Sequence, residues 1–459
     1  MKPLLALSLS VLLCCMSLAS ASSPAPSAAK LAEATAIAEA EMKEQQIPGL
    51  ALVVMQGDEV VLARGFARED IGREDSVTEK TVFGLGSIAK QFVAATILQL
   101  AEQRKLSLDD PAAQHLPEFT RLPPELKIRH LLSHTSGMRE EFVQQDLKEL
   151  FEKPGATFAE YVEAARDAPS EWPPGSRWSY SNMNYLMLTV VVERLTGEPL
   201  ERTVAKRFFE PLGLHSMQLC ALQPGESPGN ARGYIRREGE LLPHPPENVM
   251  LFRGSGGFCG SALDLARWTR ALANGKAISA HAYRQMTTRV PLTNGGKAEY
   301  GFAIDLGSHD GVQHGGYGGG FAAQAAYYPD AQLTVVVLTN RNFAFPEHIE
   351  RKISRRLLGR PEPKRVEVAI PAEELQRYAG SYDVGIPGWY PQTVVRDGRL
   401  WFELSGPPMR LPLVYVGNHE FVAADDVDGY RLTFSKDGPG RELRLVGMGM
   451  MTWYGRRRP

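Results

Sequence analysis

The sequence predicts an α/β (α+β) protein: a mixed antiparallel sheet flanked by helices with an inserted all-helical lobe, followed by a small all-β domain. Two observations support this prediction. Runs with strand character stand near both ends of residues 1–358, and a long helical stretch separates them. Beyond a proline-rich segment, about ninety residues of short β-rich runs follow, a size suited to one small domain. Strands at both ends of a domain are expected to meet in one sheet.

An export signal precedes these elements. Residues 1–21 combine Lys2, an apolar run over residues 4–18 and the small-x-small sequence Ala19-Ser20-Ala21, a pattern typical of a cleaved signal peptide. The run is short for a membrane span, so we expect no stable membrane insertion after cleavage. The mature protein is expected to begin near Ser22 and to be exported, either periplasmic or secreted.

Hydrophobic periodicity and breaker residues place the elements of the main domain, residues 22–358. Pro48-Gly49 ends the first helix, and Gln56-Gly57-Asp58 separates the two strands of a hairpin. Ser261 and Asp264 form a capping box that opens a later helix. The expected helices cover residues 29–45, 88–103, 159–166, 184–195, 200–209 and 346–358. The expected strands cover residues 50–55, 59–63, 300–306, 312–314, 321–328 and 333–339.

A linker and a second domain complete the chain. Prolines stop the preceding helix, so residues 359–370 are expected to form a linker. We expect residues 371–459 to form a β-barrel or sandwich domain, because turn signals separate their short β-rich runs. These signals are Asp397-Gly398, Gly417-Asn418 and Asp437-Gly438.

Composition argues against several classes of function. The formal net charge is -2, which gives no electrostatic reason to expect nucleic acid or an anionic membrane as a partner. The histidines form no His-Glu-x-x-His pattern and the cysteines have no metal-ligand spacing, so we expect no metal and no cofactor. Signal cleavage leaves Cys220 and Cys259, which could pair in an oxidising compartment or remain two buried thiols.

Ser87 and Lys90 stand together at the start of a predicted helix. Positions three apart share one helix face, so the Lys90 amine can reach the Ser87 hydroxyl. The helix N-terminus also offers N–H groups and a positive dipole end, which favour an oxyanion and disfavour a charged lysine. Lys90 could then act as a base toward a serine nucleophile. A serine at this position also commonly caps a helix, so the pair alone is weak.

Two further segments strengthen this interpretation. Tyr180 stands two residues before Asn182, in a loop that leads into a helix. A phenol beside a lysine can share its proton, and an amide can hold a substrate carbonyl. The glycine-rich segment from His314 to Gly320 lets a substrate backbone lie close against a strand. Taken singly, each segment is also explained by a structural role, as a capped loop or a bulged strand.

In this order, Ser87-x-x-Lys90, Tyr180-x-Asn182 and His314-x-Gly316 resemble three motifs of the serine β-lactamase and penicillin-binding-protein superfamily, and most closely those of its class C-related branch. The resemblance spans residues 35–358 and implies the β-lactamase/transpeptidase-like fold. His309-Asp310-Gly311 also fits the third motif, but it reads as a hairpin turn, so we choose His314. Other similar stretches are residues 130–137, 211–214, 256–268 and 335–340.

The resemblance implies a serine hydrolase in which Ser87 forms an acyl-enzyme while Lys90 and Tyr180 move its proton. The implied oxyanion hole consists of the backbone N–H groups of Ser87 and Tyr317. An unperturbed lysine or tyrosine has a pKa near 10, so one of the pair must have a lowered pKa to work at neutral pH. Which one is the base stays open, since so close a pair titrates as a unit. The implied substrate-binding residues are Asn182, His314 and Gly316.

His314 bears on the choice of substrate. Where the family often has a permanently charged lysine, a histidine is mostly neutral at pH 7. In the resembling group it is typical of D-amino-acid peptidases and esterases, which implies a D-amino-acid-containing peptide or a small ester as substrate. We expect uncharged substrates to be cleaved better than substrates with a carboxylate beside the scissile bond, and this gap to narrow as the pH falls and His314 gains charge.

Two alternatives remain. One is a penicillin-binding D,D-carboxypeptidase or weak β-lactamase on the same fold. The other, of a different class, is a catalytically silent binding or sensor protein. The presence of Ser87, Lys90, Tyr180 and Asn182 together argues against the silent protein.

Overall fold

The computed structural model describes most of the chain. The described ranges are residues 24–139, 145–153, 155–220, 229–237, 239–307, 311–361, 366–384, 390–405, 408–424, 430–435, 441–447 and 451–458. Outside them lie the expected signal peptide, the alternative motif residue His309, residues 362–365 of the expected linker and the turn at Asp437-Gly438. Within the described ranges, no helix has both the length and the apolar character that a membrane crossing requires.

The main domain is built on a five-stranded sheet in the order β2-β1-β10-β9-β8, in which every neighbouring pair is antiparallel. β1 and β10 consist largely of aliphatic and β-branched residues, and both are buried along nearly their whole length. Leu50 of β1 pairs with Thr339 of β10, so both ends of the domain supply one sheet, as predicted. The strands are β1 Gly49–Gln56, β2 Glu59–Ala67, β8 Val312–Gly318, β9 Phe321–Tyr328 and β10 Leu333–Thr339.

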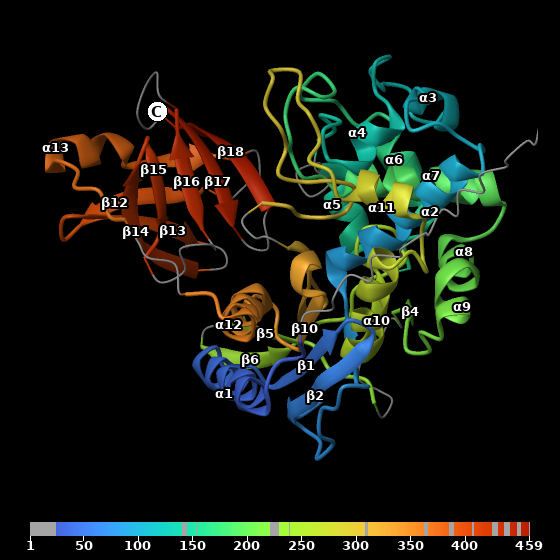
Figure 1. Ribbon diagram of the computed structural model, residues 1–459. Helices are drawn as coiled ribbons and strands as arrows, with labels where there is room; N and C mark the ends of the chain where they lie inside the picture. Colours follow the sequence, from blue (N-terminus) through green and yellow to red (C-terminus); the bar gives the residue numbers. More distant parts are fainter. Residues whose placement is uncertain are drawn as a thin grey trace, which may run out of the picture.

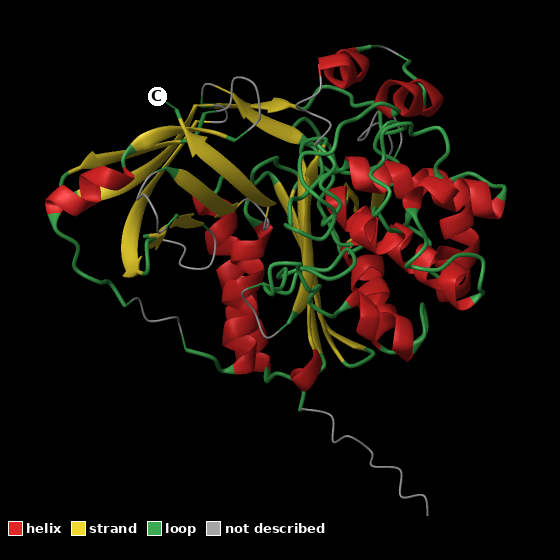
Figure 2. Ribbon diagram, turned by 90° about the horizontal axis from the view of Figure 1, so that it is seen from above, coloured by secondary structure: helices red, strands yellow, loops and turns green. Residues whose placement is uncertain are grey.

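Helices cover both faces of this sheet (Figure 1), and Figure 2 shows strands between helices on either side. On one face, α1 and α12 share an apolar cluster with β1 and β10. On the other face, Trp268 of α10 meets Phe92 of α2 edge to face. The helices are α1 Ala28–Glu44, α2 Lys90–Glu102, α3 Ala112–His115, α4 Ile128–Leu132, α5 Gln145–Glu152, α6 Phe158–Ala165, α7 Met183–Thr196, α8 Leu200–Val204, α9 Glu210–Leu212, α10 Ala262–Ala273, α11 Ala280–Met286 and α12 Pro346–Leu358.

A small second sheet leads the chain into the helical lobe. It has the order β3-β7-β4, and β3 runs directly into the helical turn before α2. A separate two-stranded hairpin, β5-β6, stands between β4 and β7 in the sequence. The bounds are β3 Val82–Gly84, β4 Gln218–Leu219, β5 Tyr234–Arg237, β6 Glu240–Pro243 and β7 Phe258–Ser261.

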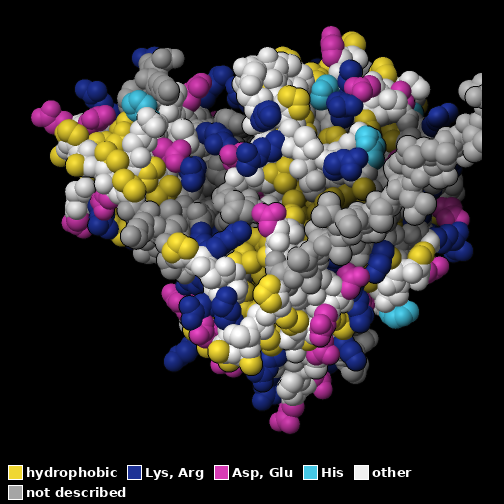
Figure 3. Space-filling view, viewed as in Figure 1, with side chains coloured by type: hydrophobic (Ala, Val, Ile, Leu, Met, Phe, Trp, Pro, Cys, Tyr) yellow, Lys and Arg dark blue, Asp and Glu magenta, His cyan; other side chains and the backbone are white. Residues whose placement is uncertain are grey.

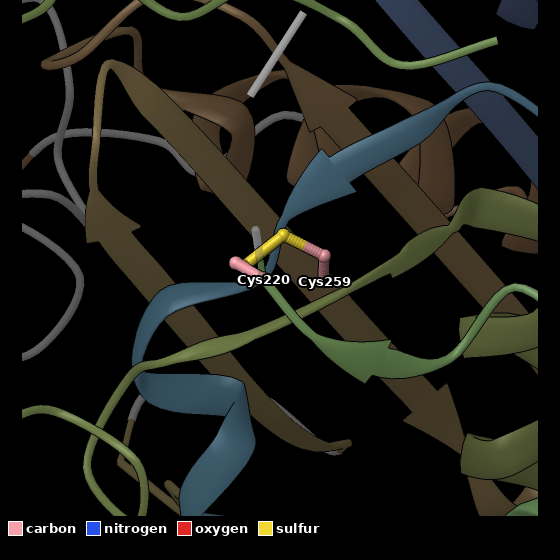
Figure 4. The surroundings of a disulfide bond; sticks show 2 residues. All are labelled: Cys220 and Cys259. Atoms are coloured by element: carbon pink, nitrogen blue, oxygen red, sulfur yellow. A yellow bond between two sulfur atoms is a disulfide. The ribbon is translucent and has the colours of Figure 1, made fainter. Parts of the chain in front are cut away.

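Cys220 and Cys259 form a disulfide, which resolves the alternative that the sequence left open. Their Cα atoms lie 5.0 Å apart, within the usual range for a disulfide. The bond joins the residue after β4 to Cys259 of β7, and Cys259 stands opposite Gly84 of β3, the strand that precedes the serine helix (Figure 4).

Two of the predicted elements differ in the structure. Residues 300–306 do not form a strand, because the chain turns back at Ala303, whose φ is +54°, and leaves isolated bridges from Asp305 to Tyr300 and to Gln313. The predicted helix 200–209 is α8 followed by a π-helical turn, Ala205–Phe209. The predicted capping box at α10 holds in part: the Ser261 side chain accepts a hydrogen bond from the Asp264 amide.

The C-terminal region is a closed eight-stranded barrel, one of the two forms that the sequence predicted. Each strand pairs with the next in sequence, and β11 closes the barrel on β18. The turn signals Asp397-Gly398 and Gly417-Asn418 have positive φ at each residue and stand between paired strands, as predicted. The elements are α13 Ala372–Leu375, β11 Gly380–Asp383, β12 Gln392–Arg396, β13 Arg399–Ser405, β14 Pro408–Gly417, β15 Glu420–Ala423, β16 Arg431–Phe434, β17 Glu442–Gly447 and β18 Met451–Arg457.

The barrel packs against the main domain through aromatic side chains. Phe343 and Phe345, which stand between β10 and α12, contact the apolar core of the barrel. Phe343 also stacks on Tyr317 of β8, at 6.4 Å between ring centroids. Elsewhere, acidic and basic side chains are interspersed on the face that Figure 3 shows, in keeping with the small net charge.

Candidate active site

Ser87 lies in a single 3₁₀ turn, Gly86–Ala89, between β3 and α2. Gly86 has a φ of +51°, a conformation that glycine adopts without strain. A Cβ atom there would lie 2.4 Å from the Tyr317 nitrogen, so only glycine lets the two segments approach. α2 begins at Lys90, two residues later than predicted, because the 3₁₀ turn precedes it.

The predicted nucleophile and its partners form one hydrogen-bonded group. Ser87 Oγ accepts from Lys90 Nζ at 3.1 Å and from Tyr180 OH at 2.8 Å. Lys90 Nζ also donates to Asn182 Oδ1 at 2.7 Å and to the Ser255 carbonyl at 2.6 Å. Lys90 is fully buried, whereas Ser87 and Tyr180 keep partial exposure. The structure thus brings together the four residues that the sequence selected from two distant segments.

A buried histidine, which the sequence analysis did not select, holds the Tyr180 loop. His134 has a φ of +56° and lies after α4. Its carbonyl accepts from the Ser179 N–H at 2.9 Å, and its Nδ1 accepts from the Ser181 N–H at 3.2 Å and from Asn184 Nδ2 at 3.0 Å. Its ring lies 4.2 Å from the Tyr180 ring, centroid to centroid. His134 therefore fixes the residues on both sides of Tyr180 and the ring itself.

His134 stays neutral in this setting. Burial, and then the charge of Lys90, hold its pKa well below the usual value of a histidine. A neutral ring leaves Nδ1 free to accept hydrogen bonds, provided that the proton resides on Nε2. The only sequence signal was that residues 130–137, which contain His134, are one of the stretches similar to the family.

β8 is the edge strand of the sheet, so alternate backbone N–H groups point away from β9. The Gln313 N–H points outward, to the Asp305 carbonyl at 3.2 Å. Tyr317, four residues on, has the same orientation, and its N–H faces Gly86. At Gly316, a Cβ would lie 2.0 Å from the Leu85 carbonyl and 2.8 Å from the Ser87 nitrogen. The two predicted oxyanion-hole amides thus stand on neighbouring segments.

His314 is placed differently from the expectation. It is 4% exposed, its Nε2 lies 2.7 Å from the Tyr300 hydroxyl and its Nδ1 lies 2.6 Å from the Gly315 carbonyl. Burial, followed by the Lys90 charge, lowers its pKa to about 3. The expectation that His314 gains charge as the pH falls is therefore wrong at pH values well above 3, because desolvation disfavours the charged imidazolium there.

Comparison with known proteins agrees with this geometry. The family model described as Beta-lactamase matches residues 34–360. The penicillin-binding protein 4 of Amycolatopsis lactamdurans is 30% identical over 379 residues, which cover 75% of this chain and 97% of that protein. The D-aminopeptidase of Brucella anthropi is 24% identical over 339 residues, 71% of this chain; the chain spans only 62% of that relative's length.

Among solved structures, the octameric penicillin-binding protein homologue of Pyrococcus abyssi superimposes with a TM-score of 0.66. The match covers 93% of this chain and 99% of that one at 23% identity. At this identity the likeness concerns the fold, and its extent includes the C-terminal region of the chain.

Proposed function

We propose that this chain, which belongs to the Beta-lactamase family and is a serine hydrolase, forms an acyl-enzyme on Ser87. Through this intermediate it hydrolyses an amide or ester bond of a small molecule or peptide. The observation that supports this most directly is the convergence of Lys90 Nζ and Tyr180 OH on Ser87 Oγ. Because nucleophile and proton acceptors are in place, the alternative of a silent binding protein loses support.

Acylation proceeds by attack of Ser87 Oγ on the substrate carbonyl carbon. The serine proton passes to the Lys90–Tyr180 pair, and the carbonyl oxygen becomes an oxyanion held by the N–H groups of Ser87 and Tyr317. The pair then returns the proton to the leaving amine or alcohol as the bond to carbon breaks. Asn182, which binds Lys90 Nζ, fixes the lysine and offers its amide to the substrate.

Deacylation uses the same groups in reverse. A water molecule attacks the acyl carbon, its proton passes to the Lys90–Tyr180 pair, and Ser87 Oγ recovers a proton as it leaves. Lys90 Nζ lies 4.9 Å from the centroid of the Tyr180 ring, so the two proton-transfer groups stay side by side in both half-reactions.

For the substrate, we propose a D-amino-acid-containing peptide or a small ester without a carboxylate beside the scissile bond. Two findings support this choice. Position 314 holds an imidazole that stays neutral, where a lysine would supply a permanent charge for a substrate carboxylate. The relatives also include D-aminopeptidases from two organisms.

A second candidate is a D,D-carboxypeptidase or weak β-lactamase. The similarity to penicillin-binding protein 4 of Amycolatopsis lactamdurans, at 30% identity, favours it. Covalent labelling by a fluorescent penicillin, followed by turnover of nitrocefin, would support this candidate. Faster cleavage of D-aminoacyl anilides or neutral esters would support the first.

Export is a further part of the proposal. The pattern of residues 1–21 and the Cys220–Cys259 disulfide, a bond that forms in oxidising compartments, support it. N-terminal sequencing of protein from the periplasm or medium should begin near Ser22. A terminus that still shows Met1 would contradict export by this signal.

The central test is substitution of the nucleophile. Ser87→Ala should abolish labelling by a fluorophosphonate and reduce turnover by about 10⁴-fold or more, because serine and base act as a unit. Lys90→Ala and Tyr180→Phe should each lose about 10²–10⁴-fold in kcat. Ser107→Ala, on an exposed loop, is the matched control and should label normally. Turnover by Ser87→Ala at the wild-type rate would refute the proposal.

A further inference from the structure

The two ends of β8 face the two halves of a bound substrate, if Ser87 acts as proposed. The leaving group must lie near Tyr180, which belongs to the pair that protonates it. Tyr180 stacks on His134, and the His134 ring lies 5.2 Å from that of Tyr300. The Tyr300 hydroxyl in turn binds His314. The leaving group therefore lies toward the His314 end of the strand.

The acyl half of the substrate then extends toward the opposite end of β8. There the strand turns into β9 through Gly318, Gly319 and Gly320, all with positive φ. A Cβ on Gly319 would make only ordinary van der Waals contacts, with nothing nearer than 3.6 Å, whereas a Cβ on Gly320 would lie 2.5 Å from the Gly233 carbonyl carbon. The acyl group can therefore lie against Gly318 and Gly319, while Gly320 is packed against Gly233.

One carboxylate borders Gly318 and Gly319. Glu247 Oε2 lies 3.7 Å from the place of a Cβ on Gly319 and 3.9 Å from that on Gly318. The Glu247 side chain is 35% exposed, so water and solutes reach it. His244, with Nε2 at 3.5 Å from Glu247 Oε1, contacts the other carboxylate oxygen. Oε2 thus points at the strand end where the acyl half lies.

We propose that Glu247 recognises an ammonium group on the acyl half of the substrate. The inference rests on the proposed acyl-enzyme at Ser87. An α-amino group stands two bonds from the scissile carbonyl, so an aminoacyl substrate would carry its charge toward the Gly318 end, near Oε2. A carboxylate there favours a cation through a charge-assisted hydrogen bond. An amine further along the acyl chain would present the same chemistry, and the substrates below distinguish the two.

The test measures kcat/KM for three p-nitroanilides: D-alanyl, N-acetyl-D-alanyl and 4-aminobutyryl. In Glu247→Gln the ratio of D-alanyl to N-acetyl-D-alanyl substrate should fall about tenfold, the effect of losing one partly exposed charged contact. If Glu247→Gln instead lowers kcat/KM mainly for the 4-aminobutyryl substrate, the ammonium group that Glu247 binds lies further along the acyl chain. Glu240→Gln, at an exposed glutamate of β6, is the matched control and should keep the wild-type ratios.

Failure of this inference is distinct from failure of the proposed function. Suppose that Glu247→Gln leaves kcat/KM unchanged for all three substrates while Ser87 still reacts with a fluorophosphonate. Then Glu247 does not bind the amine, and the hydrolase proposal stands. If wild-type Ser87 does not react, the acyl-enzyme proposal fails first. Wild-type preference for the N-acetyl substrate would also overturn the inference.

Discussion

The two ends of β8 differ in how firmly the structure holds them. At the His314 end, His134, Tyr300 and His314 are buried and fully packed against Tyr180 and one another. At the Gly318 end, a Cβ on Gly318 or Gly319 would make only ordinary van der Waals contacts, and the neighbouring Glu247 is partly exposed. The end that handles the proton is buried, and the end that would receive the acyl group is less crowded, so chemistry and selectivity reside in different parts of one strand.

The largest effect should come from the middle of β8, where both ends meet the nucleophile. In Gly316→Ala the new methyl group would lie 2.0 Å from the Leu85 carbonyl and 2.8 Å from the Ser87 nitrogen, so the backbone must shift. We expect kcat to fall about 10²–10³-fold, since the oxyanion amides lose their spacing. Steady-state kinetics on a neutral p-nitrophenyl ester, with circular dichroism to verify folding, gives the measurement.

Gly319→Ala is the matched substitution, just beyond the Gly318 end of β8. Gly319 has a φ of +61°, so alanine there is strained by roughly 1–2 kcal/mol, but the Cβ atom of that alanine would meet no atom within 3.5 Å. Its kcat on the same ester should fall less than about fivefold. Equal losses in the two variants would show that the chain just beyond the Gly318 end tolerates a side chain no better than the middle of β8.

A smaller effect is expected behind Tyr180. His134→Phe keeps an aromatic ring against Tyr180 but removes the acceptor for the Ser181 N–H, and a lost buried hydrogen bond costs about 1–3 kcal/mol. We expect kcat to fall about 10–100-fold with little change in KM, and fluorophosphonate labelling of Ser87 to slow in parallel. His281→Phe, at an exposed position in α11, serves as the control. A rise in KM alone would argue against a role in placing Tyr180.

The smallest effect concerns pH. The folded-state pKa of His314 is lowered to about 3 by burial and then by the Lys90 charge, so His314 is uncharged from pH 5 to pH 8. The ratio of kcat/KM for a matched ester pair, with and without a carboxylate beside the scissile bond, should therefore change less than about twofold over this range. A marked gain for the carboxylate ester at pH 5 would show that His314 is protonated there.

The sequence predicted the sheet, a C-terminal barrel or sandwich and the group formed by Ser87, Lys90, Tyr180 and Asn182, because strand periodicity and motif chemistry are local signals. It failed at residues 300–306, where β-rich composition conceals the tight turn at Ala303. It also missed His134 and Glu247. Their roles depend on contacts with Tyr180 and Gly318, which lie far away in sequence, and neither residue type is distinctive by itself.

The pairing of Leu50 with Thr339 affects when the enzyme can assemble. Apart from the closure of β11 on β18, each barrel strand pairs with the next, so most of that region forms through short loops once its own residues are available. In contrast, the centre of the catalytic sheet joins the two extremes of its domain, and such long-range closure is entropically costly and slow. β8 cannot be held against the Ser87 turn by a finished sheet until β10 is present. A growing chain that does not yet include β10 therefore carries Ser87 without the finished surroundings in which it is proposed to react.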